Sequence, residues 1–281
     1  MKVYIANYQP DRQGGGWSFA RNFAKGMGDS ITQNYDEADV YFIVSASMTT
    51  RDEVTKAKND GKKVVLRVDN ILRPSRNRGG GMSHMRDYAE MADLVVYQSV
   101  DARNRLSPYL GRDGKVILNS TDEDVFFPGK VANRSGHLYS RFNRDETKNF
   151  EVARDHFAKV SQVIPDLKLT IVGQFSQELQ EYNFDFYNGE DVRFMGTITD
   201  PNTMADIYRN HEYLIYTYWR DACSNTLIEA LMCGMEIVFP DEFFKKGSAN
   251  EILTMFNMYG RDFFMLHRMC SEYKNAMEAL W

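Results

Sequence analysis

The segment 213–240 constrains the fold more than any other part of the chain. Two short apolar runs, 213–218 and 235–240, lie on either side of a segment whose apolar residues repeat at helical spacing, namely Leu227, Ile228, Leu231 and Met232. A strand, a short loop, a helix and a second strand form the βαβ unit of a parallel sheet. We therefore expect an α/β protein.

The short loop of this unit, residues 221–225, is suited to binding a phosphate. The first turn of the following helix has unpaired backbone N–H groups at the positive end of the helix dipole, and Ser224 or Asn225 can cap it. Two carboxylates flank the turn, Asp221 and Glu229, with seven residues between them. The alternative is an ordinary βα loop with an Asp at the surface and a Glu in the helix.

This pattern resembles the retaining glycosyltransferases of the GT-B fold, glycosyltransferase family 4. Their signature has two acidic residues separated by seven, an Ala-Leu or Ala-Met pair and a Gly, and it reads here Asp221, Glu229, Ala230, Leu231 and Gly234. The first acid is Asp rather than the commoner Glu, so its reach is one methylene shorter.

The resemblance implies roles for the residues of this segment. In the family the first acid contacts hydroxyls of the donor sugar and the second binds the ribose of the nucleotide. These positions are Asp221 and Glu229 here. The backbone amides between them hold the diphosphate, which assigns donor binding to Cys223, Ser224, Asn225, Thr226 and Leu227.

Residues 141–149 resemble the family segment in which an Arg is followed by Lys-Gly or Lys-Asn. In the family this Arg and Lys neutralise the departing diphosphate. Breaking the sugar–phosphate bond leaves extra negative charge on the diphosphate, and fixed cations lower that barrier. Lys148 matches the Lys, whereas the spacing leaves open whether Arg141 or Arg144 matches the Arg. The alternative is a set of exposed basic residues at a helix start.

A glycine-rich turn follows the first apolar run, residues 2–8, and precedes an amphipathic helical pattern. Glycines between a strand and a helix let a backbone approach an anion closely, although the turn is neither G-x-G-x-x-G nor a Walker motif. In the family this loop faces the donor diphosphate and the acceptor, and a later turn lies near the base. The matching donor-side residues are Gly14, Gly15, Gly16 and Thr197.

Polar residues after the third apolar run, 63–68, are predicted to lie on the acceptor side. Loops at the carboxyl ends of parallel strands line the site in open α/β sheets. Many family members have a His here, whereas this chain has Asp69 and Asn70, followed by a basic, glycine-rich segment with Arg73, Arg76 and Arg78. The alternative for that segment is a solvated surface connection.

The length of 281 residues allows two modest domains. Residues 119–128 resemble the segment that leaves the first domain in the family, which also accounts for the acidic run 122–124 better than a metal-binding motif does. The resemblance implies two Rossmann-like parallel-sheet domains facing a central cleft: an acceptor-side domain, 1–128, and a nucleotide-sugar domain, 129–261. A final helix, about 262–281, is expected to pack back on the first.

The composition and the net charge argue against several classes of protein. The net charge of −5 argues against a surface that binds nucleic acid throughout, although it leaves room for a local basic groove. Cys223, Cys233 and Cys270 have no metal-like spacing and are predicted to be free thiols in a reducing compartment. No apolar run reaches the ~18 residues of a membrane span, and the first residues lack a signal-peptide core. We expect a cytoplasmic enzyme.

Together these features predict a hexosyl- or pentosyltransferase that moves a sugar from a nucleotide sugar to an acceptor hydroxyl with retention of configuration. It would need no metal and no cofactor besides the nucleotide sugar as co-substrate. The acceptor stays open between a glycan, a small molecule and DNA with hydroxymethylated bases. Some virus-encoded GT-B enzymes use such DNA, which would place this chain in a host cytoplasm. Further alternatives are a phosphorylase or epimerase on the same fold, and a nucleotide-binding module without catalysis.

Overall fold

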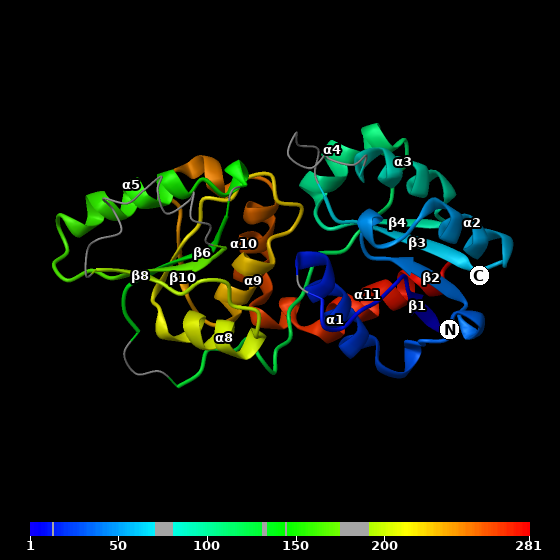
Figure 1. Cartoon of the computed structure of the whole chain (residues 1–281), viewed down its shortest axis with the longest axis horizontal. Helices are drawn as coiled ribbons and strands as arrows, with labels where there is room; N and C mark the ends of the chain where they lie inside the picture. The colour runs from blue at the N-terminus through cyan, green and yellow to red at the C-terminus, as the bar shows by residue number, and fades with distance from the viewer. Residues whose placement is uncertain (13, 71–80, 131–133, 144, 175–190) are drawn as a thin grey trace. The chain divides into compact units, whose positions relative to one another are not determined.

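The computed structural model describes residues 1–12, 14–70, 81–130, 134–143, 145–174 and 191–281. Two five-stranded parallel sheets form within them, and the contacts between residues divide the chain into two compact units. Unit 1 comprises Met1–Thr121, Arg220–Asn225 and Asn250–Trp281, and unit 2 comprises Asp122–Trp219 and Thr226–Ala249. The predicted α/β class with two parallel sheets is therefore confirmed (Figure 1).

The sheet of unit 1 has the order β1-β2-β3-β4-β5. Its strands are β1 (Val3–Ile5), β2 (Val40–Ile43), β3 (Lys63–Val68), β4 (Leu94–Tyr97) and β5 (Lys115–Val116). Its helices are α1 (Gly15–Met27), α2 (Arg51–Asn59), α3 (Gly81–Met91), α4 (Val100–Leu110), α11 (Leu266–Glu278) and α10 (Ser248–Tyr259), whose first two residues belong to unit 2.

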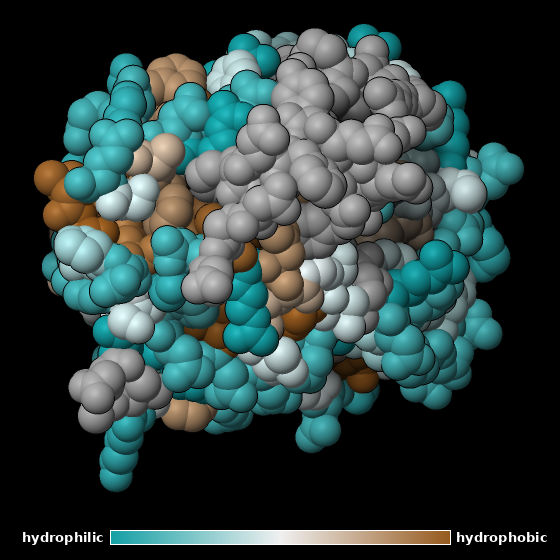
Figure 2. Space-filling view, turned by 60° about the vertical axis from the view of Figure 1, so that its left-hand side comes forward, coloured by the Kyte–Doolittle hydropathy of each residue, from teal (hydrophilic) through white to brown (hydrophobic). Residues whose placement is uncertain are grey.

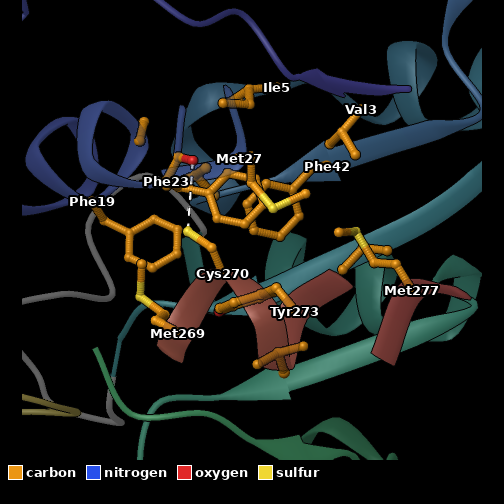
Figure 3. Close-up of a cluster of buried hydrophobic side chains, with 14 of the residues drawn as sticks. Val3, Ile5, Phe19, Phe23, Met27, Phe42, Met269, Cys270, Tyr273 and Met277 are labelled. Carbon is orange, nitrogen blue, oxygen red and sulfur yellow. Dashed lines mark hydrogen bonds between the residues drawn. The ribbon is translucent and has the colours of Figure 1, made fainter. Parts of the chain in front are cut away.

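Both faces of this sheet are covered because its strands are apolar at successive positions. Val40 and Phe42 of β2 face α1 and α11, whereas Tyr41 and Ile43 face α2 and α3. Figure 3 shows the first of these cores, in which Tyr273 of α11 lies among aromatic rings of α1 and β2.

The chain turns around the outer edge of β1 before it enters β2. Ile31 forms an isolated parallel bridge with Val3, and the Thr32 amide donates to the Val3 carbonyl over 3.0 Å. Tyr35 of a short 3-10 helix, Tyr35–Glu37, then packs against Tyr4 and Tyr41 on the opposite face. This turn explains why α1 and α2 cover opposite faces of the sheet.

The sheet of unit 2 has the order β10-β9-β6-β7-β8. Its strands are β6 (His137–Phe142), β7 (Leu169–Gly173), β8 (Val192–Phe194), β9 (Tyr213–Ile215) and β10 (Glu236–Val238). The helices α5 (Phe150–Ser161), α8 (Pro201–Asn210) and α9 (Asn225–Met232) connect them. From β6 the chain builds outward to β8 and then returns to place β9 on the other side of β6. The strand order therefore reverses between β6 and β9.

Hydrophilic side chains dominate the face seen in Figure 2, with smaller apolar patches between them. Within the described ranges, no helix is long and apolar enough to span a membrane.

The compact units differ from the sequential domains that the sequence predicts. Residues 220–225 and 250–261, predicted to lie in the second domain, belong to unit 1. The first segment contacts Ser99 and Asn119, and Glu251 in the second contacts the start of α4. Contacts between residues far apart in sequence decide this division, and no local pattern signals them. The final helix α11 packs on α1 inside unit 1.

Candidate active site

The point where the strand order reverses, between β6 and β9, brings several predicted site residues together. Ligands of open α/β sheets bind outside the carboxyl ends of strands at such a point. Arg141 lies near the carboxyl end of β6, where the register with β7 shifts and the Arg141 φ is +63°. A bulge of this kind redirects a side chain and costs backbone strain, and such strain is concentrated at functional sites.

The ring of Tyr218, which follows β9, is the centre of this group. The Lys148 Nζ lies 4.8 Å from the centroid of this ring and the Arg141 guanidinium 5.7 Å from it. The Tyr218 hydroxyl lies 3.2 Å from the Ser140 hydroxyl, which fixes the ring. Two cations therefore lie near one aromatic ring at the carboxyl edge of the sheet.

Hydrogen bonds to its backbone carbonyl hold Lys148 in place. Its carbonyl accepts hydrogen bonds from the Thr217 hydroxyl at 2.6 Å and the Tyr139 hydroxyl at 2.8 Å. Its side chain is only 2% exposed. A buried ammonium group favours a nearby anion. The alternative of exposed basic residues at a helix start is therefore wrong for Lys148.

Glu229 lies one turn inside α9 and is half-buried. The Tyr208 hydroxyl donates a hydrogen bond to its carboxylate over 3.3 Å. Burial raises the pKa of Glu229 from its ordinary value of 4.5 to about 7, against the opposing effects of that hydrogen bond and of the Arg141 charge. This carboxyl group therefore titrates near neutral pH and interacts electrostatically with one of the predicted diphosphate cations.

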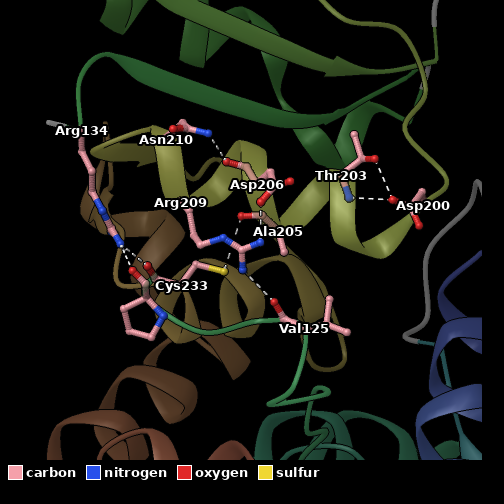
Figure 4. A network of polar contacts seen from close by, with 10 residues as sticks. Val125, Arg134, Asp200, Thr203, Ala205, Asp206, Arg209, Asn210 and Cys233 are labelled. Atoms are coloured by element: carbon pink, nitrogen blue, oxygen red, sulfur yellow. Dashed lines mark hydrogen bonds and ion pairs between the residues drawn. The ribbon is translucent and has the colours of Figure 1, made fainter. Parts of the chain in front are cut away.

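The end of α9 away from Asp221 is anchored by Arg134 within unit 2 (Figure 4). Arg134 donates to the carbonyls of Cys233 and Gly234, at 2.7 and 2.6 Å, and to the Pro128 carbonyl at 2.9 Å. The first two bonds satisfy carbonyls at the helix end, where arginine also complements the helix dipole. Arg209 of α8 donates to the Val125 carbonyl at 2.9 Å and so connects α8 to the segment before Pro128.

Thr197 is exposed beyond β8, and its hydroxyl donates to the Gly173 carbonyl at 3.2 Å. Gly173 ends β7, and a Cβ there would collide with the backbone of Phe142. This close approach holds the carboxyl ends of β6 and β7 together beside Arg141.

The loop Arg220–Asn225 packs inside unit 1. The Ser99 hydroxyl donates to the Ala222 carbonyl at 2.6 Å. The Asn119 side-chain amide donates to the Cys223 carbonyl at 3.3 Å and to the Asn225 side-chain oxygen at 2.8 Å. Cys223 and Ser224 are buried, while Asp221 is half-buried. Helix α9 starts at Asn225, so it begins in unit 1 and continues with buried Thr226 and Leu227 in unit 2.

The glycine-rich turn forms the start of α1. Gly14 precedes the helix with φ +119°, and as a glycine it has no side chain that could cap the helix. A Cβ at Gly15 would meet no heavy atom within 4 Å, whereas one at Gly16 would touch Ser45 and Met48 at 3.7 Å. The open space beside Gly15 is compatible with the close approach of a ligand to this part of the backbone.

The remaining predicted residues follow β3 or lie outside the described residues. Asp69 and Asn70 come directly after β3 and are half-buried. Arg73, Arg76, Arg78 and Arg144 lie outside the described residues.

Tyr218, Tyr208 and Asn119 contact predicted site residues, although the sequence did not predict this. Tyr218 ends an apolar run and Tyr208 lies on the apolar face of α8, so both match the pattern of core residues. Asn119 is the first residue of the predicted linker 119–128. Its place in that family-like segment was the one feature of the sequence that could have pointed to it.

The described residues contain no group of three or more His, Cys, Asp and Glu side chains that could hold a metal ion. Cys223, Cys233 and Cys270 are buried free thiols. Burial raises the pKa of Cys223 and of Cys233 to about 12, so neither is a thiolate at neutral pH.

Comparison with known proteins agrees with this geometry. Residues 136–253 match the family described as Glycosyl transferases group 1. A comparison with curated protein sequences gave no match.

Solved structures resemble the chain over nearly its whole length. Alr3699/HepE from Anabaena in complex with UDP has a TM-score of 0.67 at 14% identity, covering 98% of this chain and 95% of that chain. It is also known in complex with UDP-glucose. A glycosyltransferase from Rickettsia africae has a TM-score of 0.66 at 13% identity, covering 99% and 98%. Sucrose-phosphate synthase from Thermosynechococcus elongatus has a TM-score of 0.65 at 12% identity, covering 100% and 96%.

The TM-scores of these structures show a shared fold. The two parallel-sheet units have the GT-B fold, and residues 136–253 match the group 1 glycosyltransferase family.

Proposed function

We propose that the protein transfers a sugar from a nucleotide sugar to an acceptor hydroxyl with retention of configuration and without a metal ion. The observation that carries this proposal is the pair of cations, Lys148 and Arg141, around the Tyr218 ring. They lie where the strand order of unit 2 reverses. The match of residues 136–253 to group 1 glycosyltransferases and the UDP-glucose complex of the Anabaena neighbour support a nucleotide-sugar donor.

The donor would be held by residues with separate tasks. The first amides of α9 and the cations Lys148 and Arg141 bind the diphosphate, and their charge stabilises it as it leaves. Glu229 accepts hydrogen bonds from the ribose, and Asp221 orients the sugar hydroxyls. The open glycine turn, Gly14–Gly16, lets the ligand approach the backbone. Asp69 and Asn70 contribute to the acceptor side.

The reaction follows a front-face course. The bond between the anomeric carbon and the diphosphate oxygen breaks, and the acceptor oxygen forms its new bond on the same face. The acceptor proton passes to the departing diphosphate oxygen, so no carboxylate nucleophile is needed, in contrast to retaining hydrolases.

A thermal-shift panel of nucleoside diphosphates, with UDP first, tests the donor site. A ligand at a hundred times its dissociation constant stabilises the fold by about 2.7 kcal/mol. Lys148→Met keeps the buried volume and removes the charge, so it should abolish this shift and lower kcat by about 10²–10³. Lys159→Met, on the exposed side of α5, is the matched control and should retain the shift. No shift with any nucleotide would refute the donor site.

The acceptor is tested with UDP-glucose and other nucleotide sugars against glycans, small-molecule alcohols and DNA that contains hydroxymethylated bases. Release of the nucleoside diphosphate only with one class identifies the acceptor. Nucleotide binding without release for any acceptor would favour a binding module without catalysis.

A further inference from the structure

We propose that Asn119, braced by Arg67 and Gln98, is the positioning residue for the start of α9. The inference rests on the proposed function, because it assigns the support of the loop that would bind the diphosphate. All the contacts that carry it lie inside unit 1.

The Asn119 side chain is 2% exposed and faces the loop with its donor group. Its Nδ2 carries two hydrogens and lies within hydrogen-bond distance of three acceptors, the Asn225 Oδ1 at 2.8 Å, the Gln98 Oε1 at 2.9 Å and the Cys223 carbonyl at 3.3 Å, so that one hydrogen is shared. One side chain thus holds both the residue before Ser224 and the first residue of α9. The position of these two residues decides where the first-turn N–H groups point.

Arg67 fixes the orientation of the Asn119 amide. Its Nη2 donates to the Asn119 Oδ1 at 3.2 Å and to the Gln98 Oε1 at 2.6 Å. Since Arg67 can only donate, it requires the oxygen of Asn119 on its side and directs the Nδ2 toward the loop.

Arg67 itself is held from several elements. It is 2% exposed, its Nη1 donates to the Val44 carbonyl at 3.2 Å, and its guanidinium lies 3.8 Å from the ring centroid of Phe19 in α1. The Gln98 Nε2 donates to the Val68 carbonyl at 2.8 Å. The contacts of Arg67, Gln98 and Asn119 therefore connect the carboxyl ends of β2, β3 and β4, together with helix α1, to the loop Arg220–Asn225. A rigid supporting shell of this kind is what precise ligand geometry requires.

Two amide-to-carboxylate substitutions distinguish a role of Asn119 in positioning the loop from a general contribution to the stability of the core. Asn119→Asp keeps the acceptor for Arg67 but replaces the Nδ2 donor, so the bonds to the loop are lost. Gln98→Glu is the matched control. It also places a carboxylate beside Arg67 at a buried position and loses the bond to the Val68 carbonyl, but it keeps an acceptor for Asn119 and leaves the contacts from Asn119 to the loop in place.

The first measurement is hydrogen exchange of the amides in 221–227, which needs no ligand. Asn119→Asp should speed their exchange by about tenfold or more, the effect of losing one or two net hydrogen bonds. Gln98→Glu should leave it near the wild-type rate. Equal exchange in wild type and Asn119→Asp, or equal acceleration in both variants, would overturn the proposal.

The second measurement is the affinity for UDP. We expect Asn119→Asp to weaken it at least as much as it accelerates exchange, and Gln98→Glu to leave it close to wild type. Unchanged UDP affinity in an Asn119→Asp protein with a mobile loop would refute the link to diphosphate binding. A wild type that binds neither UDP nor another nucleoside diphosphate would refute the proposed function, whereas the exchange result would still decide whether Asn119 holds the loop.

Asn225→Ala breaks the same contact from the loop side, at a half-buried position, and serves if Asn119→Asp does not fold. It should accelerate exchange in 221–227 as well. Wild-type exchange in Asn225→Ala would count against the bond between the two asparagines as the support.

Discussion

The carboxyl group of Glu229 combines burial with the proposed role of binding the donor ribose. Its pKa of about 7 lies above the ordinary value of 4.5, mainly because of burial. The folded state therefore binds a proton that the unfolded chain has released, and the stability that this group contributes is lost as pH rises from about 4.5 through about 7.

Glu229→Gln should remove this pH dependence. The variant mimics the protonated form, so its stability relative to wild type should rise between pH 4.5 and 7 by on the order of 3 kcal/mol and then level off. Urea midpoints of both proteins across this range measure the difference. Parallel curves would show that the Glu229 carboxylate is not destabilised by burial.

Two glycines of α1 have opposite surroundings. A Cβ at Gly26 would collide with the Cys270 sulfur and lie 3.3 Å from the Leu266 Cβ, whereas a Cβ at Gly15 would meet open space. Gly26→Ala should cost about 1–3 kcal/mol through overpacking. Gly15→Ala should leave stability unchanged and weaken UDP binding. Urea unfolding and UDP titration of both variants check this contrast. Wild-type UDP affinity in Gly15→Ala would remove the glycine turn from the site.

At the scale of elements, the sequence predicts the βαβ unit around α9 because its pattern is local. The two apolar runs and the helical repeat lie within thirty residues, and β9, α9 and β10 form inside them. Strand β5 is only Lys115–Val116, although the apolar residues Ile117 and Leu118 follow it in the sequence.

The first turns of α1 and α4 differ in which groups accept hydrogen bonds from their backbone amides. The Ser99 hydroxyl accepts from the Ala102 amide, and the Glu251 carboxylate accepts from the amides of Val100 and Asp101, both at 2.7 Å. The start of α4 is thereby closed by protein groups, whereas Gly14, the residue before α1, has no side chain that could cap that helix. A helix start that the protein already caps has no free N–H group for a phosphate.

Glu251→Gln should therefore destabilise the protein without affecting the nucleotide site. The amide of Gln offers one acceptor where two N–H groups need one each, so we expect a loss of about 1–2 kcal/mol. Chemical unfolding measures the loss, and UDP titration should give the wild-type affinity. A variant with normal stability and weakened UDP binding would instead assign Glu251 to the ligand.

At the scale of the whole molecule, the sequence predicts two parallel sheets but not which segments complete each unit. Periodicity finds the strands, whereas the assignment of Arg220–Asn225 to unit 1 depends on single polar contacts such as that of Asn119. The final helix is visible as an apolar stripe. Its place against α1 depends on the fit of Cys270 to Gly26, which only the folded chain brings together.

Substitutions of Tyr273 test how much helix α11 contributes to the stability of unit 1. Its side chain is fully buried, and its ring centroid lies 5.9, 5.2 and 5.5 Å from those of Phe19, Phe23 and Phe42. Tyr273→Ala removes this aromatic centre and should cost about 3–5 kcal/mol, whereas Tyr273→Phe keeps the ring and should cost far less. Because these contacts lie inside unit 1, hydrogen exchange should accelerate in β1 and β2 and stay unchanged in β6 and β7. Equal acceleration in both sheets would mean that the two units unfold as one cooperative body.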